Sequence, residues 1–305
     1  MLSYQHAFHA GNHADILKHL TLFFVLSSLN KKEKPYTYFD THSGSGLYDL
    51  LDNRSQKTGE AEQGISRLIS SKKMISGSHP LLNDYLSLID RYYTKNFYPG
   101  SPEIARMLSR PQDFIVLSEL HPQEVENLKK NMLHPEFEAV CKNVQVHNRN
   151  GFEMLKALTP PKTKRGAVLI DPSYEEISDY VNCAKTICAV NKKWTNGIIM
   201  LWYPLLAHRE AELNQMLNEI QASARSVNPN IEICDLRLEV ASKDSHKEMS
   251  LKEYEQSEKN PPRLYGSGML VLNAPWKLEE EVNKELEVIS SCVSSTSQQS
   301  SGINA

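Results

Sequence analysis

Short apolar runs alternate along the chain with longer stretches of helical periodicity, and this alternation restricts the fold more than any other feature. The runs are rich in β-branched and aromatic residues, which are typical of buried strands. They cover residues 36–40, 114–118, 144–147, 167–171, 198–202, 231–240 and 269–273. Helical spacing of apolar residues covers 123–131, 152–158, 177–190 and 210–224. Strands that alternate with helices predict an α/β fold, with an open, mostly parallel seven-stranded sheet, helices on both faces and the last two strands antiparallel.

One long interval interrupts this alternation. Residues 41–113 contain no convincing strand, whereas apolar positions within residues 54–94 follow a helical period. We therefore predict a small helical insertion after the first strand, at about residues 50–96, within a single domain over residues 1–289. The charged segment 243–263 is expected to be a loop. The Ser- and Gln-rich residues 290–305 are predicted to form a disordered tail.

The composition of the 305 residues is that of an ordinary globular protein, with 40% hydrophobic and 23% charged residues. Because the formal net charge is −3, any contact with nucleic acid must depend on a local basic patch. The five cysteines include no CxxC pair, which argues against a zinc ribbon or a redox motif. Neither a secretory leader nor an apolar run of about 18 residues is recognisable, so we expect a cytoplasmic protein without a membrane span.

Glycines and polar residues follow the first three predicted strands at their carboxyl ends. Gly44 and Gly46 let the backbone turn tightly and approach a ligand, but Asp49 stands where a dinucleotide fingerprint needs a third glycine. Glu119 ends the second strand, where an acid accepts hydrogen bonds from ribose hydroxyls in doubly wound folds. The third strand is followed by Asn150-Gly151, at the place of an adenine ring. Each feature alone has a simpler interpretation, as a turn or a helix cap.

The fourth predicted strand ends in Asp171-Pro172-Ser173-Tyr174. A carboxylate together with the carbonyl of Pro172 can accept both hydrogens of an exocyclic amine, which makes its nitrogen able to attack a methyl group. Tyr174 offers a ring on which a flipped base can stack, a contact worth roughly 1–3 kcal/mol. A plain Asp-Pro turn is the alternative. In combination with the first three strand ends, the turn favours an S-adenosylmethionine-dependent amino-methyltransferase.

Two further segments carry polar or aromatic residues. The N-terminal segment contains His9 and His13 at i,i+4 spacing, but Gly11 between them indicates a turn rather than a zinc-binding helix, and we predict no metal site. This segment is expected to fold over the cleft instead. The second segment, LNAPW at residues 272–276, resembles an amine-binding motif, but it follows the last strand, so Asn273 and Trp276 are interpreted as structural.

Seven motifs resemble, in chain order and over residues 1 to about 280, those of the RlmJ family of 23S ribosomal RNA adenine-N6 methyltransferases. They are LSYQHAFHAGNHADILKH, DTHSGSGLYDL, YPGSPEIARML, SELHP, LIDPSYE, LWYP and GSGMLVLNAPWKLE. The resemblance implies a Rossmann-like class I methyltransferase core that uses S-adenosylmethionine. It also implies a monomer that acts on one adenine, at position 2030 of the 23S RNA, before ribosome assembly is complete.

The resemblance also implies roles for particular residues. It makes Asp171 the catalytic residue that holds the target amine and accepts its proton, with Pro172 and Tyr174 beside it. It puts Tyr4, His6 and Lys18 near the RNA. The residues that it puts against the methyl donor are His19, His42, Ser101, Glu119, Asn150 and Gly151.

Two residues depart from the family pattern. Ser173 stands where a second proline is frequent, and Asn150 stands where an aspartate is usual. Because Asp171, Pro172 and Tyr174 are present, we expect the role of the turn to survive. The amide oxygen of Asn150 can still accept a hydrogen bond from the adenine of the donor.

Several alternatives remain at this point. An amine-binding pocket of this kind also suits an adenine in DNA or a protein amide, and a nucleic-acid-binding protein without catalysis is a third hypothesis. If RNA is the substrate, positive charge must be concentrated locally. Besides Lys18, the candidates for phosphate contacts are Lys31, Lys32 and Lys34, and a second cluster of Lys162, Lys164 and Arg165. Solvated loop lysines are the simpler interpretation of both clusters.

Overall fold

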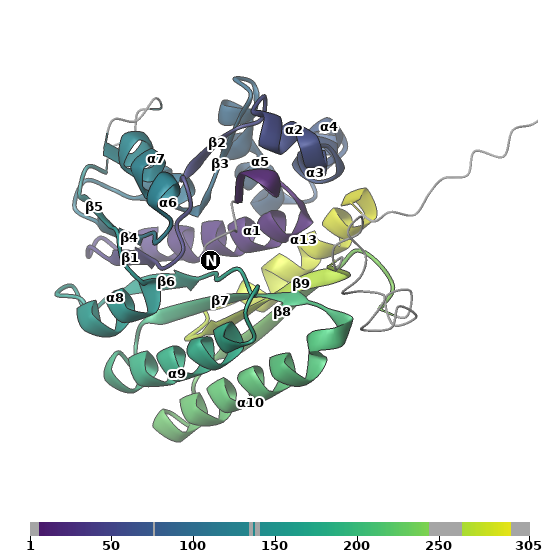
Figure 1. Cartoon of the computed structure of the whole chain (residues 1–305). Coiled ribbons are helices and arrows are strands. Elements are labelled where there is room, and N and C mark those ends of the chain that lie inside the picture. Colours follow the sequence, from purple (N-terminus) through teal and green to yellow (C-terminus); the bar gives the residue numbers. More distant parts are fainter. Residues whose placement is uncertain (1–5, 76, 134–136, 138–140, 244–263, 294–305) are drawn as a thin grey trace, which may run out of the picture.

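A seven-stranded sheet forms the centre of the molecule (Figure 1). The computed structural model describes residues 6–75, 77–133, 137, 141–243 and 264–293. In their order across the sheet, the strands are β5 (Val144–His147), β4 (Phe114–Ser118), β1 (Thr37–Asp40), β6 (Gly166–Ile170), β7 (Ile198–Leu205), β9 (Gly266–Leu272) and β8 (Ile233–Glu239). The chain proceeds from β1 through β4 to β5 and then returns to β6 on the other side of β1. This reversal opens a crevice at the carboxyl ends of the strands, and the predicted fold class is confirmed.

The last strand, β9, runs against the other strands of the described sheet. It pairs antiparallel with both β7 and β8, so that β8 runs parallel to the remaining five. The prediction that the last two strands are both antiparallel was therefore wrong for β8. This strand follows the crossover helix α10 (Glu210–Val227), and a crossover returns the chain in the parallel sense. β9 then pairs directly with the strand that precedes it, as in a hairpin.

Helices cover both faces of the sheet, because successive side chains of each strand point to opposite sides. Tyr38 points to the face covered by α1, α6, α7 and α13, whereas its neighbour Phe39 points to the face covered by α8, α9 and α10. The bounds of the helices not yet given are α1 (His13–Asn30), α6 (Ser101–Leu108), α7 (Pro122–Leu133), α8 (Gly151–Leu158), α9 (Ser178–Lys193) and α13 (Leu278–Val293).

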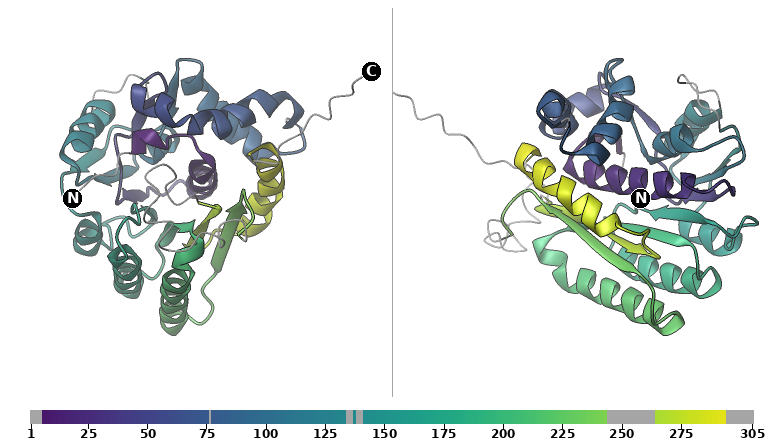
Figure 2. Two further views of the ribbon diagram at one scale, coloured as in Figure 1. Left: turned by 45° about the vertical axis from the view of Figure 1, so that its right-hand side comes forward. Right: turned by 180° about the vertical axis from the view of Figure 1, so that it is seen from behind.

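Helix α1 is buried on nearly all sides. It packs on β6, β7, β8 and β9, while α5, α6 and α13 cover its outer side. The rear view in Figure 2 shows α1 in purple with the yellow α13 beside it. A helix in such a place carries apolar residues all round. The buried Asp15, Lys18 and His19 of α1 are exceptions, and they lie in its first half, beside the crevice.

Between residues 41 and 100, the described part of the chain forms four helices and a small ribbon. The helices are α2 (Asn53–Thr58), α3 (Glu60–Gln63), α4 (Ile65–Ile75) and α5 (Pro80–Tyr93), and the ribbon pairs β2 (Leu47–Asp49) with β3 (Phe97–Pro99). The two strands were not predicted, because three residues are too few to display an alternating pattern. Their pairing, Leu47 with Pro99 and Asp49 with Phe97, brings the two ends of the helical interval together. The division of the chain into a core and an insertion remains a prediction.

The C-terminal end of the described chain is helical. α13 extends to Val293, and its Val282, Ile289 and Val293 are buried at helical spacing against the core. Residues 290–293 therefore belong to a helix and not to the predicted disordered tail, whereas 294–305 lie outside the described residues. The predicted loop at 243–263 also lies outside them, except for Lys243. None of the described helices combines the length and the apolar character needed to cross a membrane.

Candidate active site

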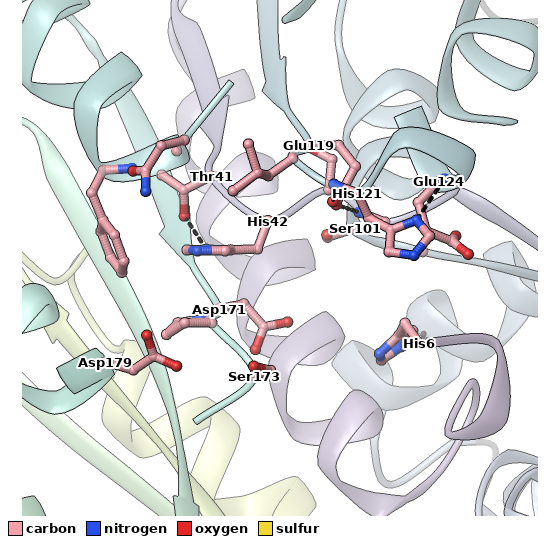
Figure 3. A pocket seen from close by; sticks show the side chains of 18 of the residues that line it. His6, Thr41, His42, Ser101, Glu119, His121, Glu124, Asp171, Ser173 and Asp179 are labelled. Carbon is pink, nitrogen blue, oxygen red and sulfur yellow. Dashed lines mark hydrogen bonds between the residues drawn. The ribbon is translucent and has the colours of Figure 1, made fainter. Parts of the chain in front are cut away.

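The carboxyl ends of β1, β4, β5 and β6 surround a cavity of about 320 Å³ (Figure 3). This volume is at the lower end of the range for small-molecule sites. Ten of the residues predicted for the site line it: His6, Lys18, His19, His42, Ser101, Glu119, Asn150, Gly151, Asp171 and Pro172. Of the other two, Tyr4 lies outside the described residues and Tyr174 is not part of the lining. The two predicted basic clusters are also absent from the lining.

The glycine loop after β1 is held against Glu119. Gly44 and Gly46 have left-handed backbones, with φ of 55° and 73°. A Cβ atom on Gly44 would lie 2.2 Å from the hydroxyl oxygen of Tyr48, so the loop requires glycine there. The backbone N–H groups of Gly44 and His121 each donate to the carboxylate of Glu119 at 2.8 Å. Burial raises the pKa of Glu119 above its usual value, although these N–H groups oppose the shift.

A buried acid that was not predicted, Asp40, supports the wall of the cavity. Its carboxylate accepts hydrogen bonds from the hydroxyls of Ser101 at 2.7 Å and Tyr38 at 2.8 Å. Burial raises its pKa to about 6, against the effect of these two bonds. His42 follows two residues later, and Thr41 holds its Nδ1 at 2.8 Å. Burial lowers the pKa of His42 to about 4, so that its ring is neutral at pH 7.

Asn150 and Gly151 form the start of α8 at the end of β5. The side-chain oxygen of Asn150 accepts the N–H groups of Phe152 at 2.9 Å and Glu153 at 3.2 Å, which makes Asn150 the N-cap of the helix. A Cβ atom on Gly151 would lie 2.0 Å from the carbonyl oxygen of Thr41. Only glycine therefore allows this helix to approach the β1 loop. The oxygen that was expected to accept from an adenine already caps a helix here.

Asp171, which follows β6, is bound by a lysine 153 residues away. The ammonium of Lys18 lies 2.6 Å from Oδ2 of Asp171 and 2.8 Å from Oδ1 of Asp15. Burial alone would lower the pKa of Lys18, but these two carboxylates raise it above its usual value. Lys18 is therefore charged, and it joins α1 to the end of β6. Figure 3 shows Asp171 below His42 in the cavity.

Asp15 lies at the centre of this charged network, although it was not predicted as a site residue. It is 1% exposed, and its Oδ2 accepts from the ring of His6 at 3.0 Å and from the N–H of Gly11 at 2.8 Å. Burial would raise the pKa of Asp15, but His6 and Lys18 hold it well below its usual range. An acid in the first turn of a helix usually interacts favourably with the helix dipole. The sequence therefore gives no sign that Asp15 also binds Lys18 and His6.

His19 is a buried histidine in the lining of the cavity, and its Nε2 lies 3.9 Å from Oδ1 of Asp15. Its Nδ1 lies 2.9 Å from the hydroxyl of Tyr98. Burial lowers the pKa of His19 to about 3, so the ring is neutral. Within the part of the chain that the structure describes, its Nε2 has no hydrogen-bond partner, although it is buried. A buried polar atom of this kind is expected to find a partner, and a bound ligand would provide one.

The ring of Tyr174 is buried, contrary to the prediction of an exposed aromatic platform. Its hydroxyl donates to the carbonyl of Trp202 at 2.8 Å, and its ring centroid lies 4.7 Å from that of Tyr180. The backbone of Tyr174 is left-handed, with φ of 55°, and the side chain is 7% exposed. In this structure Tyr174 thus packs into the core, whereas Pro172 and Ser173 line the cavity.

The segments around His9 and Asn273, for which neither a metal-binding nor an amine-binding role was predicted, are held by hydrogen bonds. His9 follows the 3-10 helix η1 (His6–Phe8), and its Nδ1 lies 2.9 Å from the carboxylate of Glu60. Among the described residues, no three His, Cys, Asp or Glu side chains group as metal ligands would. Asn273, interpreted as structural, donates to the carbonyls of Thr195 and Gly197 at 3.0 and 2.7 Å.

Comparisons with known proteins identify relatives along nearly the whole chain. A family model described as "Ribosomal RNA large subunit methyltransferase D, RlmJ" matches residues 33–302. Ribosomal RNA large subunit methyltransferase J of Escherichia coli (strain K12) is 35% identical over 286 residues, which are 94% of this chain and 92% of that protein. The protein of the same name from Haemophilus influenzae is 37% identical over 291 residues, with the same coverage.

A solved structure extends the likeness to three dimensions. The crystal structure of protein LPL1258 from Legionella pneumophila has a TM-score of 0.76 and 30% identity, and the match covers 95% of this chain and 96% of that one. The motifs of the glycine loop, of Glu119 and of Asp171 predicted the same relationship. The chain belongs to the RlmJ family of ribosomal RNA large subunit methyltransferases.

Proposed function

We propose that this chain transfers a methyl group from S-adenosylmethionine to N6 of one adenine in 23S ribosomal RNA. The observation that carries the proposal is the position of the Asp171-Pro172 turn, which lines the same cavity as the glycine loop and Glu119. The amine-binding turn and the donor site therefore share one space. Membership of the family supports the reaction class and the kind of substrate.

The cavity residues fit the methyl donor. The carboxylate of Glu119 is fixed by two backbone N–H groups and is suited to accept hydrogen bonds from ribose hydroxyls. His19 lines the cavity, and we expect its Nε2, which has no hydrogen-bond partner among the described residues, to meet a polar group of the donor. His42, Ser101, Asn150 and Gly151 complete the donor side, as the family resemblance implies. The donor supplies a methyl group on a positively charged sulfur, and the acids around the cavity favour that charge.

The chemistry at the target amine follows from Asp171 and Pro172. The Asp171 carboxylate and the Pro172 carbonyl accept the two hydrogens of the amine, which concentrates lone-pair density on nitrogen. Lys18 binds one carboxylate oxygen of Asp171, so the other oxygen is left for the amine. The nitrogen–carbon bond forms as the sulfur–carbon bond breaks, and the proton that nitrogen then releases passes to Asp171. Lys18 and His6 line the same cavity, and we expect them to contact the flipped nucleotide.

Tritiated methyl transfer to protein-free 23S RNA transcripts tests this proposal. We expect N6-methyladenine in the digested RNA, and a loss of about 10²- to 10⁴-fold in the Asp171→Ala variant, the range for removal of a group that transfers a proton. Asp179→Asn, in a second acid that lines the cavity, is the matched control and should retain most of the activity. Transfer only to DNA or to a protein amide would replace RNA as the substrate. Absence of donor binding would leave a nucleic-acid-binding protein without catalysis.

The proposal also covers the assembly state of the RNA, the cellular compartment and the oligomeric state of the protein. A base must leave its stack to enter this cavity, which favours RNA that ribosomal proteins do not yet cover. We expect a cytoplasmic monomer, as the family resemblance implies. Equal rates on naked RNA and on complete large subunits would contradict the first expectation, and a dimer mass in light scattering would contradict the second.

A further inference from the structure

Basic side chains from three separate segments meet at the edge of the sheet opposite the cavity. Parallel strands have their carboxyl ends at one edge and their amino ends at the other, and all these residues precede the amino end of a strand. Because β1 lies between β4 and β6, the three segments are neighbours. We name this set the amino-edge surface: Lys31, Lys32 and Lys34 before β1, Arg110 before β4, and Lys162, Lys164 and Arg165 before β6.

Two arginines hold the three segments together. The guanidinium of Arg110 donates to the carbonyls of Lys32 at 2.9 Å and Lys34 at 3.1 Å. The guanidinium of Arg165 donates to the carbonyls of Lys34 and Leu29. Both guanidinium groups thus donate to the carbonyl of Lys34, which holds the two cations close together. The surface is therefore assembled by specific contacts.

The five lysines of the amino-edge surface remain exposed. Among the described residues, none of them forms an ion pair with an acid. The acids of the same segments are Glu33, which is exposed, and Asp113, which is buried and bound by Arg110. Positive charge therefore predominates on this surface, although the whole chain has a net charge of −3.

The cavity has the opposite charge. Its lining includes the six acids Glu119, Glu124, Asp171, Glu175, Glu176 and Asp179. The one lysine in that lining, Lys18, is already bound to two carboxylates. Such a lining accepts a neutral base and a cationic donor but repels phosphate groups. Because phosphate contacts supply most of the affinity of proteins for nucleic acid, the attraction for the RNA backbone must come from another part of the protein.

We propose that the amino-edge surface binds the phosphate backbone of the RNA substrate at a distance from the target adenine; this inference rests on the proposed function. The strands between the two edges have four or five residues, and at about 3.3 Å per residue they separate the edges by roughly 15 Å. The nucleotides that reach the surface are therefore not the immediate neighbours of the flipped base. The two edges lie on opposite sides of the sheet, so RNA must bend around the protein to contact both. A long transcript can do this, whereas a short stem-loop is too stiff to bend in this way.

A simpler role for these lysines is to complement the carboxyl end of α1, which lies beside them. If this is their role, replacing these lysines with glutamates should change the free energy of unfolding by a few tenths of a kcal/mol and leave the affinity for RNA unchanged. The two explanations therefore differ in what they predict for binding.

Filter binding of a radiolabelled 23S RNA transcript separates them. The variant is the triple charge reversal Lys31→Glu, Lys32→Glu, Lys162→Glu. The control reverses three other exposed lysines, Lys73→Glu, Lys185→Glu and Lys284→Glu, and changes the net charge equally. We expect at least a tenfold rise in Kd for the first triple variant and less than a threefold rise for the control. The slope of log Kd against log salt should also fall by about 2 to 3 in the first variant.

Methyl transfer provides the second readout. With a stem-loop of about 20 nucleotides that contains the target adenine, both triple variants should match the unmodified protein. Equal Kd values for the two triple variants would overturn the inference. If the protein binds the transcript but methylates none of its adenines, the proposed function fails, while the Kd comparison still decides for or against the surface.

Discussion

The Asp15→Asn substitution should lower the free energy of unfolding by about 3 kcal/mol. Asp15 is buried, and its carboxylate contacts the Lys18 ammonium at 2.8 Å and the His6 ring at 3.0 Å. Removal of one partner of a buried ion pair typically costs about 3–5 kcal/mol, because the other charge stays buried. Lys18 keeps its contact with Asp171, so the lower end of this range applies.

A double-mutant cycle measures how much of that cost comes from the pair itself. Urea unfolding followed by circular dichroism, applied to Asp15→Asn, Lys18→Met and the double variant, should give a coupling energy of about 2 kcal/mol. Asp90→Asn is the control, because the Asp90 carboxylate contacts Lys72 at 3.2 Å but is 37% exposed. Its pair should contribute less than about 1 kcal/mol. Additive costs of the two single substitutions at Asp15 and Lys18 would refute the reasoning.

The same substitution has a pH signature with a defined sign. The pKa of Asp15 is lower in the folded protein than in the unfolded chain. The stability that its carboxylate contributes is therefore complete above pH about 4 and is lost as the pH falls through the folded pKa. The difference between the unmodified protein and Asp15→Asn should stay constant from pH 8 to about 5 and shrink at lower pH. A difference that is absent at pH 7 would contradict the assignment.

Three further substitutions test other contacts. The pKa of His42 is about 4 in the folded protein against 6.5 for the free side chain. As the pH falls below 6.5, protons bind His42 in the unfolded chain but not in the folded protein, so the folded protein loses about 2 kcal/mol of stability between pH 7 and 5. His42→Gln should abolish this part of the loss, and an unchanged pH profile would exclude a buried neutral ring. Gly151→Ala should cost more than about 3 kcal/mol in thermal unfolding, because its Cβ would lie 2.0 Å from the carbonyl oxygen of Thr41. Tyr174→Phe should lose about 1 kcal/mol with the hydrogen bond to Trp202 and retain methyl transfer; loss of activity at unchanged stability would instead give the hydroxyl a role in the reaction.

The central sheet could be predicted because its inner strands are buried on both faces and form continuous apolar runs, whereas the edge strands β5 and β8 are partly exposed and alternate apolar with polar residues. All seven runs found in the sequence became strands of the sheet. Polar residues at the ends of parallel strands meet at one edge, so the sequence alone was enough to place Glu119, Asn150 and Asp171 together. The ribbon of β2 and β3 could not be predicted, since its pairing depends on contacts between residues about 50 positions apart.

The burial and contacts of individual side chains were harder to predict from the sequence. Tyr174 was expected to be exposed, but its left-handed backbone turns the ring into the core, toward Tyr180 and Trp202. Asp15 resembles an ordinary acid at the start of a helix, and its burial depends on the packing of the insertion and the sheet around α1.

By itself, the sequence determined the fold class, the family and the set of residues at the strand ends, because these depend on local patterns of apolar and polar residues. Only the tertiary structure decided which charges meet. Lys18 and Asp171, which form an ion pair, are 153 residues apart, and Arg165 donates to the backbone carbonyl of Lys34 across 131 residues. These contacts, and the protonation states that follow from them, depend on how α1 and the loops pack against the sheet, because burial and the distance between charges are properties of the folded chain.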